Sequence, residues 1–169
     1  RASECDQLTG VANRLGLARS LDHLTAEDAS IIVAYCDVDE FKLVNDRDGH
    51  GAGDDVLRDI ARALVSAVRP RDVVARIGGD EFAVVIRDSG TSHDIEALAE
   101  RMLACVRHEV PSATATLSIG ISGPAPACEA SALLHVADRA LYEAKRLGKN
   151  RFVVHPFPPG DATDAARTR

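Results

Sequence analysis

Two adjacent glycines, Gly78 and Gly79, stand between two apolar runs, Val73–Ile77 and Phe82–Ile86. The runs are typical of β-strands, and glycine supplies the positive φ angles that a tight hairpin turn needs. Two acidic residues, Asp80-Glu81, follow the glycines directly. Backbone without side chains, beside two carboxylates, suits a site that admits a phosphate closely and holds a divalent metal. On these residues alone an ordinary hairpin with a polar tip remains an alternative.

Segments with helical and strand-like patterns alternate on both sides of this hairpin. The run Ile31–Cys36 is continuously apolar, which is typical of a strand covered on both faces. Further strands are expected at 114–121 and 151–154, with loops at 49–51 and 123–126. Helices are expected at 11–24, 41–46, 53–68, 95–106 (capped by Ser92 or Asp94) and 131–147. The order strand, helix, hairpin, helix, strand predicts an α+β fold, a ferredoxin-like mixed sheet with helices packed around it.

The composition bounds the class of protein. A chain of 169 residues, 46% hydrophobic and 27% charged, predicts one globular domain with a sizeable core. The net charge of -6 argues against general binding to nucleic-acid polymers or anionic membranes, although a single nucleotide held through a metal stays compatible with it. No apolar run approaches the roughly 20 residues of a membrane span, and we expect no signal peptide. We therefore expect a cytoplasmic domain, whose full-length protein could be anchored in a membrane through a segment outside this chain, and we expect the four cysteines to be free thiols.

The domain is expected to occupy residues 1–157. Residues 158–169 are rich in Pro, Gly, Asp, Thr and Ala, and we expect a disordered tail there. The only methionine is Met102, which suggests that the chain is a piece of a longer protein with an N-terminal regulatory region outside it.

Acidic residues follow the first apolar strand. Strand alternation places Asp37 and Asp39 on the same side. In the predicted fold this strand neighbours the hairpin, so Asp37 and Asp80 meet, and two such carboxylates repel unless a cation neutralises them. Because Mg²⁺ favours a few carboxylates together with substrate phosphates, these residues indicate a metal site that engages a nucleoside triphosphate. The alternative is a set of separate, solvated loop acids.

Other polar residues are candidates for contacts with such a nucleotide. The lysines Lys42, Lys145 and Lys149 could offer positive charge to phosphates, or could be ordinary surface lysines. Asn45 and Asp54 could together read a guanine edge, with the carboxylate accepting two N–H donors and the amide meeting the remaining polar atoms. Asp54 is equally suited to be an acid near a helix N-terminus.

Six motifs follow one another in an order that resembles a single family. They are Asp6–Gly10 with Asn13-Arg14, Asp37–Lys42 with Asn45-Asp46, Gly49-His50 with Gly53-Asp54, Gly78–Phe82, Leu117–Gly120, and Ala137–Tyr142 with Ala144-Lys145 and Gly148–Arg151. This succession resembles the GGDEF family, the diguanylate cyclase domain, and covers roughly Asp6 to Val154. Six motifs in the right order argue against a chance match.

The resemblance implies a fold similar to polymerase palms and nucleotide cyclases, and an enzyme that joins two GTP into cyclic di-GMP and releases two pyrophosphates. It implies that Asp37, Asp80 and the backbone carbonyl of Val38 hold two Mg²⁺ per GTP, with Mn²⁺ as an alternative ion. Glu81 would lie beside the attacking 3′-hydroxyl, as base or metal partner. By two-metal logic, ions about 3.5–4 Å apart would clamp the reacting phosphate.

The same resemblance assigns the substrate contacts. Asn45 and Asp54 would read guanine. The phosphates would be held by Lys42, Lys145 and Lys149 beside the bare backbone of Gly78 and Gly79. The family often carries Arg at position 149, and Lys lacks the bidentate fork of Arg. Each domain would hold one GTP, so two domains must face each other as a homodimer through the catalytic face.

A charged string, Arg69-Pro70-Arg71-Asp72, precedes Gly78 with five residues between them. An RxxD at this spacing resembles the product-inhibition site of the family. Arg69 can pair bidentately with a phosphate or stack on guanine, and Asp72 can accept guanine N–H donors. Arg101 on the following helix is a second candidate contact. We expect cyclic di-GMP bound there to hold two domains apart; the alternative is a charged connection without a ligand.

Two hypotheses from different classes remain at this point. One is an enzyme, a diguanylate cyclase. The other is a binding module that holds GTP or cyclic di-GMP and signals without catalysis. The presence of Asp37, Asp80, Glu81 and Lys145 together favours the enzyme.

Overall fold

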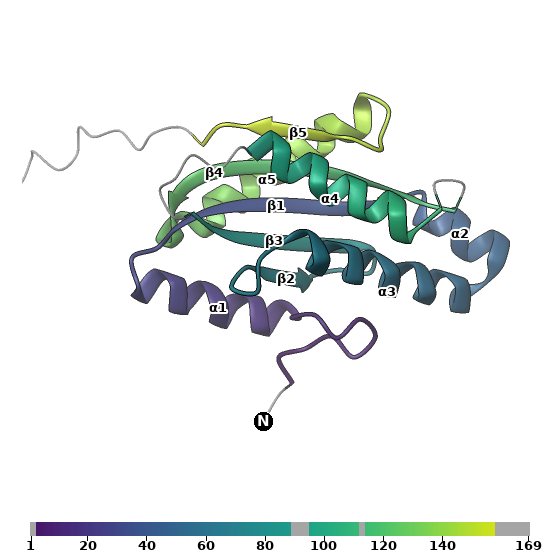
Figure 1. The fold of residues 1–169 in the computed structure, drawn as a ribbon, viewed down its shortest axis with the longest axis horizontal. Coiled ribbons are helices and arrows are strands. Elements are labelled where there is room, and N and C mark those ends of the chain that lie inside the picture. Colours follow the sequence, from purple (N-terminus) through teal and green to yellow (C-terminus); the bar gives the residue numbers. More distant parts are fainter. Residues whose placement is uncertain (1–2, 89–94, 112–113, 158–169) are drawn as a thin grey trace, which may run out of the picture.

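The structure is a computed structural model, and it describes residues 3–88, 95–111 and 114–157 (Figure 1). The helices are α1 (Arg14–Ala26), α2 (Phe41–Asp48), α3 (His50–Ala67), α4 (Ile95–Glu109), the short 3₁₀ helix η1 (Ala127–Glu129) and α5 (Ala130–Arg146). The strands are β1 (Ser30–Asp39), β2 (Val73–Arg76), β3 (Glu81–Asp88), β4 (Thr116–Pro126) and β5 (Phe152–His155). The expected helix cap at Ser92 or Asp94 and the expected tail at 158–169 lie outside the described residues.

One five-stranded sheet, in the order β2-β3-β1-β4-β5, organises the domain. The central strand β1 pairs antiparallel with β3 on one side and with β4 on the other. The strand β5 adds to β4 in parallel, so the sheet is mixed. The predicted α+β fold, with the first strand beside the hairpin, is therefore confirmed.

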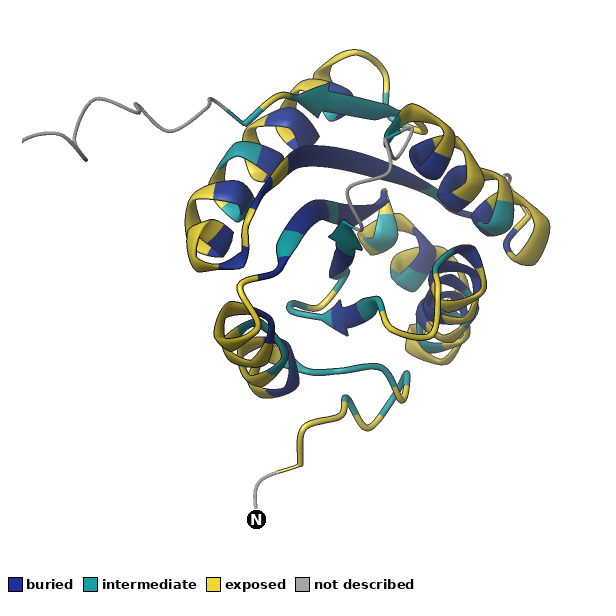
Figure 2. Ribbon diagram, turned by 60° about the vertical axis from the view of Figure 1, so that its left-hand side comes forward, coloured by how far each residue is buried: buried dark blue, intermediate teal, exposed yellow. Residues whose placement is uncertain are grey.

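Helices cover both faces of the sheet, because strand alternation sends successive apolar side chains to opposite sides. Ile32, Ala34 and Cys36 belong to the core beneath α3 and α4, whereas Ile31 and Val33 belong to the core beneath α1 and α5. Figure 2 shows the sheet between these two layers, with the buried sides of the helices facing it. Two cores thus fix β1 from both sides, and its C-terminal end carries the candidate carboxylates.

The helix α5 approaches the sheet unusually closely at Gly120 in β4. A Cβ at this position would overlap the carbonyl oxygen of Ala137 and the backbone nitrogen of Leu141 in α5. Only glycine admits this contact, which sets the position of α5 relative to the sheet. The same helix carries Lys145 near its C-terminal end.

Two segments that were expected to be loops belong to regular elements. The helix α3 begins at His50, four residues before Asp54. Of the expected loop 49–51, only Gly49 lies outside the helix, and its φ is 86°. Residues 123–126 belong to β4, where Ala125 and Pro126 pair with Ile31 and Ser30 at the start of β1, beyond a register shift between Ile31 and Val33. Proline is tolerated there because β5 pairs with β4 only as far as Ser122, which leaves this half of β4 as an edge in the described part of the chain.

Within the described residues, no helix combines the length and the hydropathy that crossing a bilayer requires.

Candidate functional site

The turn between β2 and β3 is closed by backbone hydrogen bonds. The amides of Ile77 and Gly78 donate to the carbonyl of Glu81 at 2.9 and 3.3 Å. Neither Gly78 nor Gly79 has a left-handed φ, so the expectation that glycine serves positive φ angles here is wrong. A Cβ at Gly78 would instead overlap the Glu81 carboxylate, and one at Gly79 would meet nothing within 4 Å. Glycine therefore leaves room for a carboxylate on one side of the turn and for a ligand on the other.

The N-terminal segment holds this turn in place. The guanidinium of Arg76 donates to the Gly79 carbonyl at 2.8 and 3.1 Å and forms an ion pair with Asp6 at 3.1 Å. Asp6 also accepts hydrogen bonds from the backbone amide and the hydroxyl of Thr9. Arg14 donates to the Ile77 carbonyl. Sequence reasoning missed the pair of Arg76 and Asp6, although an arginine two residues before Gly78 and an aspartate in the first motif were its visible signals.

Three carboxylates converge where β1 meets the turn. The antiparallel register places Asp37 opposite Glu81, and the amide of Val38 donates to the Asp80 carbonyl at 3.1 Å. Burial raises the pKa of Asp37, the ammonium of Lys145 at 2.9 Å opposes that rise, and the negative charges of Asp80 and Glu81 add to it. The predicted meeting of Asp37 and Asp80 is thus found, with more negative charge than one lysine neutralises.

This donor set fits a hard divalent cation. In the ranges that the structure describes, no group of three or more His, Cys, Asp and Glu side chains is close enough to hold a metal ion by itself. The available donors are therefore the carboxylates of Asp37 and Asp80 with backbone oxygens such as the Val38 carbonyl. Mg²⁺ binds in this way, through one or two carboxylates completed by water and substrate phosphates.

Two of the three candidate lysines lie beside this cluster, and both form ion pairs. Lys145 contacts Asp37, and Lys149 contacts Glu40 at 2.8 Å, so each pair joins the end of α5 to the end of β1. The third, Lys42, is exposed on α2. Sequence analysis did not identify Glu40. Because the pair of Lys149 and Glu40 is about half exposed, it adds little to stability, and a phosphate can readily replace Glu40 as the partner of Lys149.

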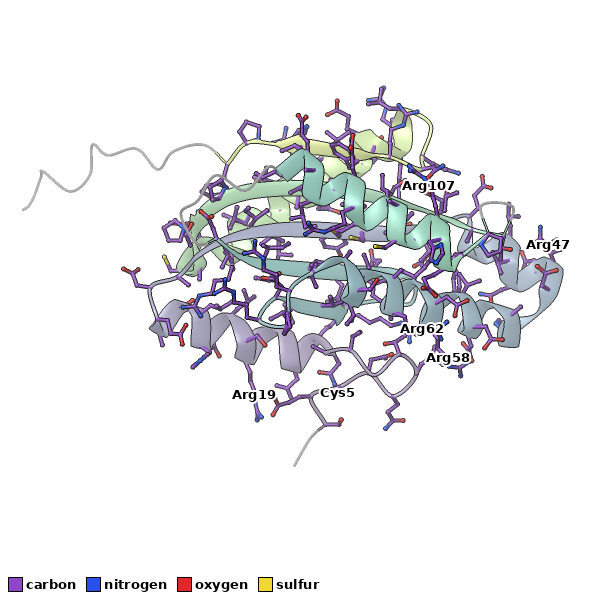
Figure 3. The ribbon with its side chains drawn as sticks, viewed as in Figure 1. Cys5, Arg19, Arg47, Arg58, Arg62 and Arg107 are labelled. Atoms are coloured by element: carbon purple, nitrogen blue, oxygen red, sulfur yellow. The ribbon has the colours of Figure 1, made fainter. Side chains whose placement is uncertain are left out.

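Surface arginines add little positive charge to the site. Figure 3 shows Arg47 on α2 and Arg58 and Arg62 on α3. All three form ion pairs with neighbouring acids of their own helices. The positive charge that reaches Asp37 therefore comes from α5.

The candidate guanine-reading residues lie where α2 meets α3. A Cβ at the buried Gly53 would overlap the amide oxygen of Asn45, so glycine here allows the Asn45 side chain to lie against α3 next to Asp54. Both Asn45 and Asp54 are half-buried. Since α3 begins at His50, Asp54 lies beyond its first turn, where the helix dipole has little effect. The alternative role as a helix N-terminal acid therefore loses its support.

A cavity of about 660 Å³ adjoins the site. It shares Asp39, Glu40 and Lys149 with the phosphate side, but its lining includes neither Asp37 nor Asp80. The carboxylate cluster thus lies beside this cavity and does not line it.

The RxxD string forms a turn at the other end of β2 from the glycines. The Asp72 carboxylate accepts hydrogen bonds from the amide of Arg69 at 2.8 Å and from the amide of Arg87 at 3.1 Å. Arg69 is exposed. Arg101 donates to the Ala67 carbonyl at 2.7 Å, at the end of α3 that leads into this turn. The structure therefore brings the three predicted residues of this second site into one region.

Comparison with known proteins gives concordant results. Residues 3–151 match the family model described as diguanylate cyclase, GGDEF domain. The chain is 38% identical over 156 residues to cyclic di-GMP phosphodiesterase PdeB of Shewanella oneidensis, covering 89% of this chain and 18% of that protein. It is 38% identical over 151 residues to diguanylate cyclase TpbB of Pseudomonas aeruginosa, covering 83% of this chain and 35% of that protein. The chain thus spans between about a fifth and a third of these two relatives.

A solved structure agrees in fold as well as in sequence. The crystal structure of the GGDEF domain of DgcB from Caulobacter crescentus in complex with c-di-GMP superposes with a TM-score of 0.79 at 31% identity, covering 91% of this chain and 96% of that one. With a family model that matches most of its length, this chain belongs to the diguanylate cyclase GGDEF domain family.

Proposed function

We propose that this chain is a diguanylate cyclase, which condenses two GTP into cyclic di-GMP and releases two pyrophosphates. The observation that carries the proposal is the convergence of Asp37, Asp80 and Glu81 beside the open glycine turn, faced by Lys145. These carboxylates repel one another in the free protein. A bound cation would neutralise that repulsion, so the cluster favours binding of a metal ion together with a phosphate. TpbB, a relative named as a diguanylate cyclase, supports the same activity.

In this proposal the guanine of each GTP binds between α2 and α3. The Asp54 carboxylate accepts the guanine N–H donors, and the Asn45 amide meets the remaining polar atoms. The phosphates extend toward Lys42, Lys145 and Lys149, and the bare backbone at Gly79 lets them approach the turn. Binding exchanges the lysine–carboxylate pairs for lysine–phosphate pairs.

Asp37, Asp80 and the carbonyl of Val38 would hold two Mg²⁺ per GTP, with Mn²⁺ as an alternative ion. When bound, such ions polarise the α-phosphate and stabilise the leaving pyrophosphate. Glu81 lies opposite Asp37 in the sheet, next to Asp80. We infer that its carboxylate takes or orients the proton of the attacking 3′-hydroxyl.

The first bond joins two GTP molecules. The 3′-oxygen of one attacks the α-phosphorus of the other, the bond between that phosphorus and the bridging oxygen breaks, and pyrophosphate leaves with that oxygen. In the linear product, the remaining 3′-oxygen attacks the remaining α-phosphorus in the same way, which closes the ring and releases the second pyrophosphate. Because one domain holds one GTP, two copies of the chain must face each other through the catalytic surface.

Incubation of the protein with GTP and Mg²⁺, followed by chromatography, tests the activity. Cyclic di-GMP with two pyrophosphates per product is the expected result. The non-catalytic binding module remains the competing hypothesis, since PdeB, another relative, is named as a phosphodiesterase and this chain covers only 18% of it. Tight GTP binding without any product would favour that module.

The Gly53→Ala variant is expected to lower the preference for GTP over ATP by about tenfold, because the new methyl group displaces the Asn45 amide from the guanine edge. Stability should not fall, since alanine improves helix propensity by roughly 1 kcal/mol. Competition titration and thermal unfolding measure the two effects. Gly51→Ala is the matched control, because a Cβ there meets nothing within 4 Å. Equal nucleotide preference in both variants would contradict the role of Asn45.

The proposed function includes feedback inhibition by its product. Cyclic di-GMP is expected to bind at Arg69, Asp72 and Arg101 and to inhibit by holding two domains apart. The double variant Arg69→Ala/Asp72→Ala should lose binding and inhibition while turnover continues, as measured by product titration of the initial rate. Arg71→Ala, an exposed arginine in the same turn, is the control and should keep inhibition. Inhibition of the double variant equal to that of the wild type would place feedback elsewhere.

A further inference from the structure

Asp39 is a buried acid that the catalytic proposal does not use. Its side chain is 5% exposed, and both of its oxygens accept hydrogen bonds. The hydroxyl of Ser118 donates to Oδ1 at 2.6 Å, and the hydroxyl of Thr116 donates to Oδ2 at 2.7 Å. The backbone amide of Asn150 donates to Oδ2 at 3.0 Å. Because it accepts three hydrogen bonds from protein groups, this carboxylate has a structural set of partners.

The contact with Asn150 reaches a turn of unusual backbone geometry. Gly148, Lys149 and Asn150 have successive φ angles of 116°, 60° and 49°. Lys149 and Asn150 are two of only four non-glycine residues with positive φ in the described part of the chain. Such conformations persist where the surroundings hold them firmly, and they gather at functional sites.

Hydrogen bonds from three segments hold this turn. The amides of Gly148 and Lys149 donate to carbonyls of α5, and the Arg151 side chain donates to the Lys149 carbonyl at 3.1 Å. The contact with Asp39, through the Asn150 amide, is the one that ties the turn to the end of β1 by its backbone. Glu40 follows Asp39 directly, has a φ of 57°, and pairs with Lys149 through its carboxylate. Two adjacent acids at the end of β1 thus engage two adjacent residues of the turn, one through the backbone and one through the side chain.

The pairing of β4 with β5 is secured separately. The amide of Ile119 donates to the carbonyl of Arg151 at 2.9 Å, and the parallel register continues from Phe152. Loss of the Asp39 contact should therefore loosen the turn at Lys149 without detaching β5.

We propose that Asp39 is a positioning residue that holds Lys149 in place for the substrate phosphates through its hydrogen bond to the Asn150 amide. This inference rests on the proposed function, in which Lys149 binds phosphate. Asp39 touches no substrate itself, and its effect on the nucleotide passes through Lys149.

The test compares GTP affinity in four variants, with a non-hydrolysable GTP analogue and Mg²⁺ in a calorimetric titration. Asp39→Asn replaces one acceptor oxygen by an N–H₂ donor and should weaken binding by about tenfold. Lys149→Ala should weaken binding to a similar extent, and the double variant should show no further loss, because the two residues act as a unit. Ser118→Ala removes a donor to the other oxygen of Asp39 and should leave affinity unchanged, even where it lowers thermal stability.

Hydrogen exchange of the Asn150 amide gives a readout that needs no nucleotide. Exchange should accelerate in Asp39→Asn and not in Ser118→Ala. Additive losses of affinity, or unchanged affinity in Asp39→Asn, would overturn the inference while the proposed function stands. A wild-type chain that binds no GTP analogue would contradict the proposed function, and this inference with it.

Discussion

Asp80→Ala is expected to lower cyclic di-GMP formation by at least about a thousandfold, because in the proposed mechanism it removes a carboxylate ligand of the catalytic metal ions. The fold should be retained. Asp80 contacts β1 through its backbone carbonyl, which accepts from the Val38 amide, and the substitution leaves that bond in place. Product is measured by chromatography and folding by thermal unfolding.

A second expectation concerns the stability of the Asp80→Ala variant. The negative charge of Asp80 helps to raise the pKa of Asp37, which means that it disfavours the ionised Asp37 carboxylate. Its removal should leave stability at neutral pH equal to or above that of the wild type, so activity and stability change in opposite directions. Asp55→Ala, which removes an exposed acid from α3, is the control for net charge and should keep turnover. Appreciable product from a well-folded Asp80→Ala protein would contradict the metal-ligand role.

Asp54→Ala is expected to reduce the discrimination between GTP and ATP by about 10- to 100-fold. A site that accepts two guanine N–H donors leaves its half-buried carboxylate unpaired when adenine enters, and alanine removes that penalty. The ratio of dissociation constants from competition titration measures the effect.

The neighbouring variant Asp55→Ala serves as the matched control. Asp55 is exposed on the same helix and pairs with Arg58, three residues further along, so its loss should leave nucleotide preference as it was. If Asp54→Ala discriminated as well as the wild type, Asp54 would be only a structural acid of α3.

The apolar patterns of the segments and the order of strands and helices were sufficient to predict the central sheet of this domain. The apolar run around Val33 and the two runs flanking Gly78 were predicted to be strands of one sheet, and the pairing of these strands brings Asp37 to Asp80. The predicted end of the strand β4 was less accurate, because the structure extends this strand to Pro126. Residues 123–126 were predicted to be a loop because glycine and proline disfavour strands, yet β1 is long enough to pair with Ala125 and Pro126 where β5 has ended.

The parts of the site that sequence reasoning missed are contacts between distant segments. The ion pairs of Arg76 with Asp6 and of Lys149 with Glu40 join residues 70 and 109 positions apart. No local pattern specifies them, since each depends on where the sheet places both partners. The role of Gly78 was misread for a related reason, because its lack of a side chain accommodates Glu81 across the turn and does not serve a left-handed φ.

The rate of cyclic di-GMP formation across a dilution series of the protein, with saturating GTP and Mg²⁺, tests the central claim most directly. Each chain contributes one GTP to a reaction that needs two, so specific activity should rise with protein concentration in the dilute range and level off once the facing dimer is formed. GTP binding without product at any concentration would contradict the claim of an enzyme. Constant specific activity, in samples shown to be monomeric, would contradict the facing dimer.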